Sequence, residues 1–450
     1  MPIFSYSAIL LGAWMSMPAL SHAVETSAEQ TSAQGETAKI DPASTQAENA
    51  DTGPNWKEDT LTGDWGGARS TLYKKGIELQ FTHKSDVLSN VSGGLKRGTE
   101  WLGHTEARIA LDLEKLAGWN STTAYIHYHS DLGGKFNRDY VGGFMGVDNI
   151  EVGHNTAQFF HAWIQKKLFS DNLSVLGGIY PIDSEFYVTD TSGIFLAPPY
   201  GMSNEVAQTG KNGPPIFPIG ALAVRVKFTS PGKNFYAMGA ITDGVPGDPN
   251  NPNGTRIILG HGDGTLAIAE LGYTPQHESA KPEGADAEDA EYFDKTAIGF
   301  WRYTSHFDDV DPTVSARHKS QGAYVLAERT LYTEKGHPAR GLSGFVRFGT
   351  ASDSVNKVDW TTSLGLRYHG LISGRGDDIA GVAVTVNHAG DRFRNANGGD
   401  STETDWELTY RAQVKPWLAV QPNVQYIVNP GMDTTLKNAV VLGLRTEIAF

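Results

Sequence analysis

The last eleven residues of the chain read Val440-Val441-Leu442-Gly443-Leu444-Arg445-Thr446-Glu447-Ile448-Ala449-Phe450. Starting from Val440, every second residue is apolar except Thr446, and the positions in between include Arg445 and Glu447. Because successive side chains of a β-strand point to opposite faces, this pattern predicts a strand with one apolar and one polar face. A strand of a soluble sandwich can show the same pattern, so the rest of the chain has to distinguish the two.

The same alternation recurs upstream, with Val, Leu and aromatic residues on one face and Arg, Glu, Gln and Asn on the other. It predicts sixteen strands, at 77–90, 104–115, 121–130, 157–169, 172–181, 220–229, 234–242, 264–273, 295–305, 321–332, 341–351, 359–370, 379–389, 403–414, 418–429 and 439–450. An even number of strands with this two-faced pattern is typical of a barrel with lipid outside and water inside. We therefore predict an all-β, transmembrane, antiparallel β-barrel of about sixteen strands.

The composition narrows the classes of protein to which the chain can belong. It has 450 residues, a formal net charge of −14 and no cysteine. The lack of cysteine excludes disulfides, cysteine-bound zinc and thiol catalysis, and the acidic balance argues against nucleic acid as a partner. No apolar run reaches the roughly 18 residues of a spanning helix, so the chain could cross a membrane only as a closed barrel.

The lengths of the connections support the barrel. If both ends of the chain lie in the periplasm, the inner connections are short turns, and the long connections lie outside, as in outer-membrane barrels. The long set is 131–156, 182–219, 243–263, 306–320 and 390–402. One acidic connection, 274–294, is long although it falls on the inner side. It is either a periplasmic excursion or a sign that the strand count slips there.

Four parts of different character follow one another along the chain. Residues 1–23 have the short apolar region and small-residue cleavage pattern of a secretory signal peptide. Residues 24–55 form an acidic tail that is too poor in apolar residues to fold, and we expect it to be disordered. Residues 56–76 form an N-terminal helical segment, and residues 77–450 form the outer-membrane barrel.

The N-terminal helical segment has recognisable boundaries. Asp64 is a candidate cap for a short helix that runs to Lys75, and Gly76 would end it. Leu72 and Tyr73 would then face inward.

Several longer motifs resemble a known family. They are Leu61-Thr62-Gly63-Asp64-Trp65-Gly66-Gly67-Ala68-Arg69, Ser85-Asp86-Val87-Leu88-Ser89-Asn90-Val91-Ser92-Gly93-Gly94, Gly370-Leu371-Ile372-Ser373-Gly374-Arg375, Gln421-Pro422-Asn423-Val424-Gln425-Tyr426-Ile427-Val428-Asn429-Pro430-Gly431 and Val441-Leu442-Gly443-Leu444-Arg445-Thr446. In sequence and order they resemble the carbohydrate-selective porin family OprB. The resemblance implies a sixteen-stranded porin of the bacterial outer membrane that passes monosaccharides such as glucose, with polyols as further candidates.

A sugar-selective pore needs hydrogen-bonding groups for hydroxyls and aromatic faces for the C–H side of a ring. Polar residues of the inward parity and of the 182–219 connection are the candidates: Glu106, Arg108, Trp163, Asp183, Arg225, Arg302, Arg347, Arg367, Arg411 and Arg445. Barrel interiors also carry Arg–Glu pairs merely to be wet and rigid. The 182–219 connection is the candidate constriction loop, because it is long and its prolines would stiffen it.

Other functions remain open at this stage. A general diffusion porin, a barrel enzyme and a partner in exopolysaccharide export are the alternatives, although no G-x-S-x-G motif marks a nucleophile. His127 and His129 have the i, i+2 spacing of a metal pair on a strand, but no third ligand is evident, and we assign neither a metal nor another cofactor. The expected partners are small sugars and membrane lipid, and the choice between a single protomer and a homotrimer is left open.

Overall fold

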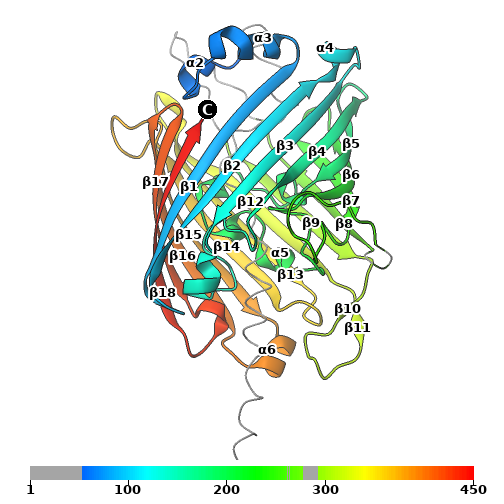
Figure 1. Cartoon of the computed structure of the whole chain (residues 1–450), viewed down its shortest axis with the longest axis vertical. Coiled ribbons are helices and arrows are strands. Elements are labelled where there is room, and N and C mark those ends of the chain that lie inside the picture. Colours follow the sequence, from blue (N-terminus) through cyan, green and yellow to red (C-terminus); the bar gives the residue numbers. More distant parts are fainter. Residues whose placement is uncertain (1–52, 261, 263, 277–291) are drawn as a thin grey trace, which may run out of the picture.

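The computed structural model describes residues 53–260, 262, 264–276 and 292–450, and sixteen strands of this part form a closed antiparallel barrel (Figure 1). The barrel strands are β1 (Ile77–Gly94), β2 (Gly98–Asp112), β3 (Thr122–Gly133), β4 (Thr156–Leu168), β5 (Leu173–Tyr180), β6 (Ala221–Thr229), β7 (Phe235–Asp243), β8 (Thr265–Tyr273), β9 (Lys295–Tyr303), β12 (Gln321–Glu334), β13 (His337–Ala351), β14 (Val358–His369), β15 (Ile379–Ala389), β16 (Thr402–Lys415), β17 (Leu418–Val428) and β18 (Lys437–Ala449). β18 pairs with β1 and closes the barrel, with Arg445 opposite Asp86. All sixteen predicted strands are therefore confirmed, with small shifts at their ends.

The alternation along the strands sorts side chains between the two faces of the wall. On β18, Leu442 and Leu444 are 44% and 47% exposed, whereas Val441 and Arg445 on either side of this pair are buried. β9, β12 and β16 repeat the pattern, each with a row of exposed apolar residues on its outer face. The outer face is thus apolar and the inner face polar, as the sequence predicts.

The strand order also resolves the acidic connection 274–294. β8 and β9 are neighbours in the barrel, and the turn between them lies at the same end as the short turns. Among the described residues, no strand has therefore been missed or added at this connection, and it is a long connection on the inner side. Most of this connection, residues 277–291, lies outside the described residues, as do the predicted signal peptide 1–23 and nearly all of the predicted tail 24–55.

The N-terminal segment differs in part from the prediction. It contains α2 (Trp56–Asp59), the 3-10 turn η1 (Trp65–Gly67) and α3 (Ala68–Lys74). The predicted single helix is interrupted because Gly66 and Gly67 both have positive φ, so Gly67 is the N-cap residue of α3. Asp64 still caps the helix through its side chain, because its carboxylate accepts the backbone N–H of Ser70 in the first turn. Gly76 ends the helical segment as predicted, with φ of 91°.

The buried residue of α3 is not one of those predicted. Leu72 and Tyr73 are only half-buried, whereas Arg69 is 1% exposed. Its guanidinium donates to the backbone oxygen of Phe450 and lies 4.0 Å from the centre of the Trp65 ring. Arg69 thus ties the N-terminal segment to the end of β18, and Figure 1 shows these helices beside the C-terminus.

The remaining short elements lie in the connections. They are α4 (Leu113–Ala117), η2 (Asn137–Val141), η3 (Ile182–Ser184), η4 (Thr191–Ile194), η5 (Pro198–Tyr200), α5 (Asn204–Ala207), α6 (Asp391–Asn397), η6 (Pro430–Met432) and the two-stranded sheet of β10 (Phe307–Asp308) and β11 (Arg317–His318). Within the described ranges, no helix combines the length and the apolar character that crossing a membrane requires.

Two long connections fold into the barrel rather than away from it. We call residues 134–155, between β3 and β4, the first inner loop, and residues 181–220, between β5 and β6, the second inner loop. Most of their residues are buried. Figure 1 shows α5 of the second inner loop inside the ring of strands. The second inner loop was predicted as a constriction loop, whereas the first was expected to lie outside.

Candidate functional site

Wall carboxylates hold the second inner loop across the barrel. Glu270 on β8 accepts the backbone N–H of Tyr187 at 2.9 Å, and Glu328 on β12 accepts that of Thr191 at 2.8 Å. Glu407 on β16 accepts the N–H groups of Leu196 and Ala197 at 2.6 and 2.9 Å. Because these carboxylates belong to strands spread around the barrel, the loop must run through the interior and narrow it.

Arg347 on β13 anchors the same loop through its backbone carbonyls. Its guanidinium donates to the carbonyl oxygens of Tyr200 and Gly201, the latter at 2.6 Å, and lies 4.4 Å from the centre of the Tyr187 ring. Tyr187 in turn stacks on Tyr324 of β12 with ring centres 3.9 Å apart. Charged groups form the stronger hydrogen bonds in a protein interior, so this arrangement fixes the loop firmly.

The first inner loop is anchored by β16 and β18. Glu403 accepts the backbone N–H groups of Phe144 and Met145 at 2.8 and 2.7 Å. Arg445 donates to Asp86 at 2.6 Å and, in the loop, to Asn149 at 2.7 Å. The two inner loops also bind each other, since Gln208 donates to the carbonyl of Phe144 at 2.7 Å. They form one plug-like layer inside the barrel.

Burial of the inner loops changes the acidity of their carboxyl groups. Burial raises the pKa of Asp183 to about 7, although its side chain accepts the N–H of Phe217 at 3.0 Å. Burial likewise raises the pKa of Glu205 to about 7. Burial would also raise the pKa of Glu185, but Lys227 and Arg225 nearby lower it to about 2.

A first charged arc crosses β16, β18, β1 and β2 on the inner wall. It consists of Lys84, Glu106, Arg108, Arg411 and Glu447. Arg108 pairs with Glu106, and Lys84 lies 3.8 Å from Glu106. Arg411 lies 3.7 Å from Glu447, which is opposite Lys84 in the β1–β18 register. The side chains of Arg411 and Glu447 remain 14% and 20% exposed, so this end of the arc is in contact with water.

A second charged arc covers β6 to β9 and the start of the second inner loop. It consists of Glu185, Arg225, Lys227, Glu270 and Lys295. Arg225 and Lys227 lie 2.7 and 3.4 Å from Glu185, and Lys295 lies 3.7 Å from Glu270. Tyr236 on β7 joins the two halves, because its hydroxyl donates to Glu270 and both lysines approach its ring face. The arc offers acceptors, donors and an aromatic face within one surface.

The structure distributes the predicted pore residues among different roles. Glu106 and Arg108 lie together in the first arc with Arg411, and Arg225 lies in the second. Arg347 and Arg445 hold the inner loops. Trp163 is half-buried on β4 and donates to His161, Asp183 is buried in the second inner loop, and Arg367 lies 4.6 Å from the centre of the Phe293 ring.

Arg302 contradicts its predicted inward position. It lies between Trp301 and Tyr303, which are buried at 2% and 0%, and it shares the outer parity with Ile298 and Phe300, which are exposed. The prediction placed Arg302 on the inward face together with the other strand arginines that it named. Arg302 is the penultimate residue of β9, where an outward cation can reach the edge of the apolar band.

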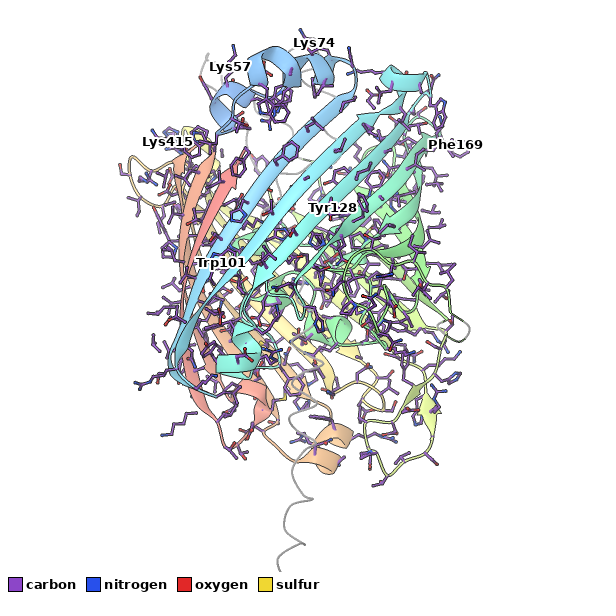
Figure 2. All side chains as sticks on the ribbon, viewed as in Figure 1. Lys57, Lys74, Trp101, Tyr128, Phe169 and Lys415 are labelled. Atoms are coloured by element: carbon purple, nitrogen blue, oxygen red, sulfur yellow. The ribbon has the colours of Figure 1, made fainter. Side chains whose placement is uncertain are left out.

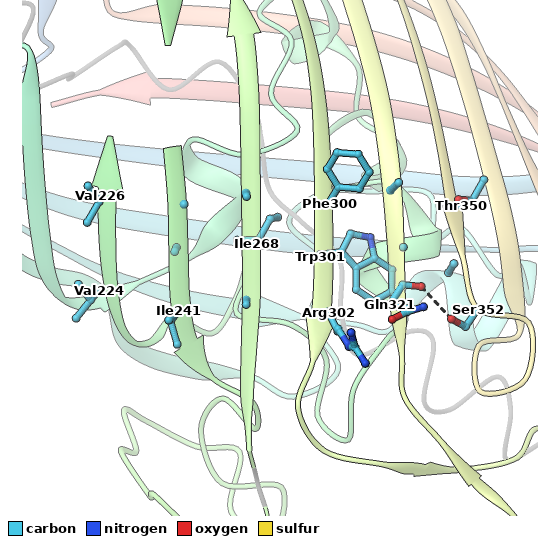
Figure 3. Close-up of a pocket in the computed structure, with 17 residues that line it drawn as sticks. Val224, Val226, Ile241, Ile268, Phe300, Trp301, Arg302, Gln321, Thr350 and Ser352 are labelled. Carbon is cyan, nitrogen blue, oxygen red and sulfur yellow. Dashed lines mark hydrogen bonds between the residues drawn. The ribbon is translucent and has the colours of Figure 1, made fainter. Parts of the chain in front are cut away.

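Arg302 borders a hollow on the outer wall over β6 to β13, with a volume of about 960 Å³ (Figure 3). Small residues on neighbouring strands form the floor of the hollow: Gly239, Ala267, Ala269 and Ala323. Its rim includes three exposed apolar side chains, those of Val224, Ile241 and Phe300. The hollow is therefore apolar and separate from the polar interior.

Several important residues are missing from the sequence prediction. They are the wall groups Lys84, Asp86, Lys227, Glu270, Lys295, Glu328, Glu403, Glu407 and Glu447. Lys227, Glu270 and Glu407 alternate with outward apolar residues, as the predicted arginines do. The strand pattern could have found them, since carboxylates on that parity are as informative as arginines.

A closed antiparallel barrel with an apolar outer face, a polar inner face and loops folded into the lumen defines a channel protein of the outer membrane. The family described as "Carbohydrate-selective porin, OprB family" matches residues 96–450. Porin B of Pseudomonas aeruginosa is 25% identical over 431 residues, covering 87% of this chain and 91% of that protein. The putative porin QuiX of Acinetobacter baylyi is 25% identical over 440 residues, covering 88% and 94%.

The solved structures agree with the fold. The structure of Pseudomonas putida OprB at high pH has a TM-score of 0.77 and 23% identity, covering 88% of this chain and 99% of that one. The chain belongs to the OprB family of carbohydrate-selective porins, and its place is the bacterial outer membrane. The named relatives are porins, so the family gives no support to the enzyme alternative.

Proposed function

We propose that the barrel conducts monosaccharides, with glucose as the reference solute and small polyols as further substrates, past the two charged arcs into the periplasm. The observation that carries the proposal is that charged side chains of both arcs stay partly exposed in an interior that the inner loops narrow. Arg411 and Glu447 do so in the first arc, and Lys227, Glu185 and Lys295 do so in the second.

The chemistry of these groups suits a neutral, hydroxyl-rich solute. Carboxylates accept from hydroxyls, Arg and Lys donate to them, and the ring of Tyr236 offers a face for C–H groups. The charges are already paired with one another, so a sugar gains little by replacing one partner. Binding therefore stays weak enough for release, as conduction requires.

The test is single-channel conductance of the purified full chain in a planar bilayer, with glucose titrated into the bath. Saturable block at millimolar glucose supports a sugar site in the lumen, and sorbitol, tested in the same way, addresses polyols. If glucose does not change the conductance, the protein is a general diffusion porin, which is the second candidate. If the purified protein forms no conducting channel, the proposed pore function is wrong.

The outer wall also has to be covered in the membrane, either by lipid alone or by the sister barrels of a homotrimer. The hollow bordered by Arg302 and Phe300 is the surface best shaped for such a contact. Light scattering of the detergent-solubilised protein distinguishes the two. One barrel per particle means that lipid covers the hollow, and three support the trimer.

A further inference from the structure

Four histidines lie together in the wall of the barrel, behind the end of the second inner loop. They are His104 on β2, His127 and His129 on β3, and His161 on β4, and none is more than 9% exposed. The sequence indicated only the spacing of His127 and His129. In the structure, His127 stacks on His161, and His129 turns toward a different pair of residues.

The residues that His129 joins are His104 and Asp131. Nδ1 of His104 lies 2.6 Å from Oδ1 of Asp131, and Nδ1 of His129 lies 2.5 Å from Oδ2 of the same carboxylate. The ligand atoms of the three residues all lie within 4.8 Å of one another. His104 is 2% exposed and the other two are 0% exposed, so one carboxylate bridges two imidazoles in a fully buried place.

The other edge of His129 shows which nitrogen carries its hydrogen. Nε2 lies 3.1 Å from the carbonyl oxygen of Pro218, which can only accept, so Nε2 must donate. In a neutral ring Nδ1 is then a bare lone pair, and it faces the Asp131 carboxylate. Consistent with this, Nδ1 of His129 and Oδ2 of Asp131 have no partner in hydrogen-bond geometry although they are 2.5 Å apart. A lone pair facing a carboxylate at this distance is unfavourable, and either a proton on the ring or a bound metal ion would remove the conflict.

His104 also has an acceptor at each ring nitrogen, but both of its contacts are in hydrogen-bond geometry. Its Nε2 lies 2.8 Å from Oε1 of Glu106, another acceptor, and its Nδ1 faces Asp131. If Nε2 donates to Glu106, a second lone pair points at the same carboxylate. Metal-binding histidines characteristically donate their second ring N–H to a carboxylate or a backbone carbonyl, which fixes the tautomer. Here Glu106 supplies the carboxylate for His104, and Pro218 supplies the backbone carbonyl for His129.

We propose that Nδ1 of His104, Nδ1 of His129 and the carboxylate of Asp131 bind a divalent transition-metal ion of the zinc class. Two imidazole nitrogens and a carboxylate form a ligand set that suits Zn²⁺. Zn²⁺ holds such ligands at about 2.0–2.2 Å. Each Nδ1 would therefore have to move away from the Asp131 carboxylate by about 1 Å or less to admit the ion. One such ion supplies the two positive charges that would otherwise require an extra proton on each ring.

The ion would connect the barrel wall to the second inner loop. His129 donates to Pro218, Gln158 donates to the same carbonyl at 2.7 Å, and the ring of Phe217 lies edge-on to His104 with centres 5.4 Å apart. Fixing both imidazoles therefore fixes the point at which the loop returns to β6. The site touches the first charged arc only through Glu106, and it is tested without any transport measurement.

The experiment uses the full chain without a histidine tag, refolded into detergent with ZnCl₂ and then freed of loosely bound metal by dialysis. Metal content is measured by mass spectrometry, and folding is checked by the altered gel mobility of unheated barrel. We expect one zinc per chain. His129→Gln and Asp131→Asn should lose it, and His161→Gln, the same change on the neighbouring strand, should keep it.

Refolding with Co²⁺ gives a second readout on the unaltered chain, because Co²⁺ bound to nitrogen and oxygen in a site of low coordination number absorbs visible light strongly. Such a band supports the site even if His129→Gln fails to fold. The proposal is overturned if the folded chain holds no stoichiometric zinc and shows no cobalt band, which would mean that protons alone occupy the cluster. It is also overturned if His129→Gln and Asp131→Asn bind as much zinc as His161→Gln.

Discussion

Arg347 on β13 and Arg411 on β16 both point into the barrel, yet they do different things. Arg347 is 0% exposed beneath the second inner loop and is bound to its carbonyls. The side chain of Arg411 is 14% exposed and pairs with Glu447 on the wall. The difference teaches that strand parity only selects the inner face, whereas the loops decide which inner residues meet the water path. Figure 2 shows the side chains on the ribbon, with the exposed Trp101 and Tyr128 labelled.

The largest effect should come from Arg347→Ala. It removes two charge-assisted hydrogen bonds to the second inner loop, each worth about 1.5–3 kcal/mol. We expect the free energy of unfolding in urea to fall by about 3–6 kcal/mol and single-channel conductance to rise as the loop loosens. Arg347→Lys, which cannot span both carbonyls, should be intermediate. Unchanged conductance together with unchanged protease resistance of the loop would contradict the anchoring role.

Asp183→Asn should change how stability depends on pH. The pKa of Asp183 is about 7 in the folded chain and near 4 when exposed, so the folded state holds a proton that the unfolded state loses. The contribution to stability is complete below pH 4 and is lost as the pH rises to about 7, about 4 kcal/mol at most.

The asparagine keeps an acceptor for Phe217 and cannot ionise. Urea unfolding at pH 5 and pH 8 should therefore show a smaller decline for Asp183→Asn than for the unaltered chain. Equal declines would mean that Asp183 is not protonated in the folded loop.

Arg411→Gln should act on solute binding more than on stability. The pair with Glu447 is partly exposed, and pairs of this kind contribute about 0.2–1 kcal/mol. We expect the glucose concentration for half-block to rise by up to about 5-fold, with little change in unfolding. A half-block concentration equal to that of the unaltered chain would remove Arg411 from the sugar path.

The smallest effect should come from Arg302→Gln, because Arg302 lies on the outer face. Conductance and glucose block should be unchanged, and unfolding should shift by less than about 0.5 kcal/mol. This variant is the matched control for Arg411→Gln, since both remove one arginine from a strand of the wall. A clear change in glucose block would show that Arg302 reaches the lumen after all.

Much of the fold could be predicted because it depends on local pattern. The period of two is a property of each strand by itself, and it located all sixteen strands and the two faces of the wall. Leu442 and Arg445 fell on the expected faces because neighbouring side chains of a strand must alternate. The prediction put Arg302 on the wrong face because it relied on residue type, and an arginine near a strand end can lie on either face.

The candidate site could be predicted only in part, because it depends on residues far apart in the chain. Glu403 binds the N–H of Phe144 across 259 positions, and Glu407 binds that of Leu196 across 211. Likewise, His129 and Asp131 of β3 meet His104 of β2, whereas His127 turns to His161, and Pro218 fixes a tautomer from a distant loop. The sequence by itself determined the strands, their number and the polarity of each face, because alternation is local. Only the tertiary structure decided which polar groups hold the inner loops and which face the water, because that depends on where two long loops pack.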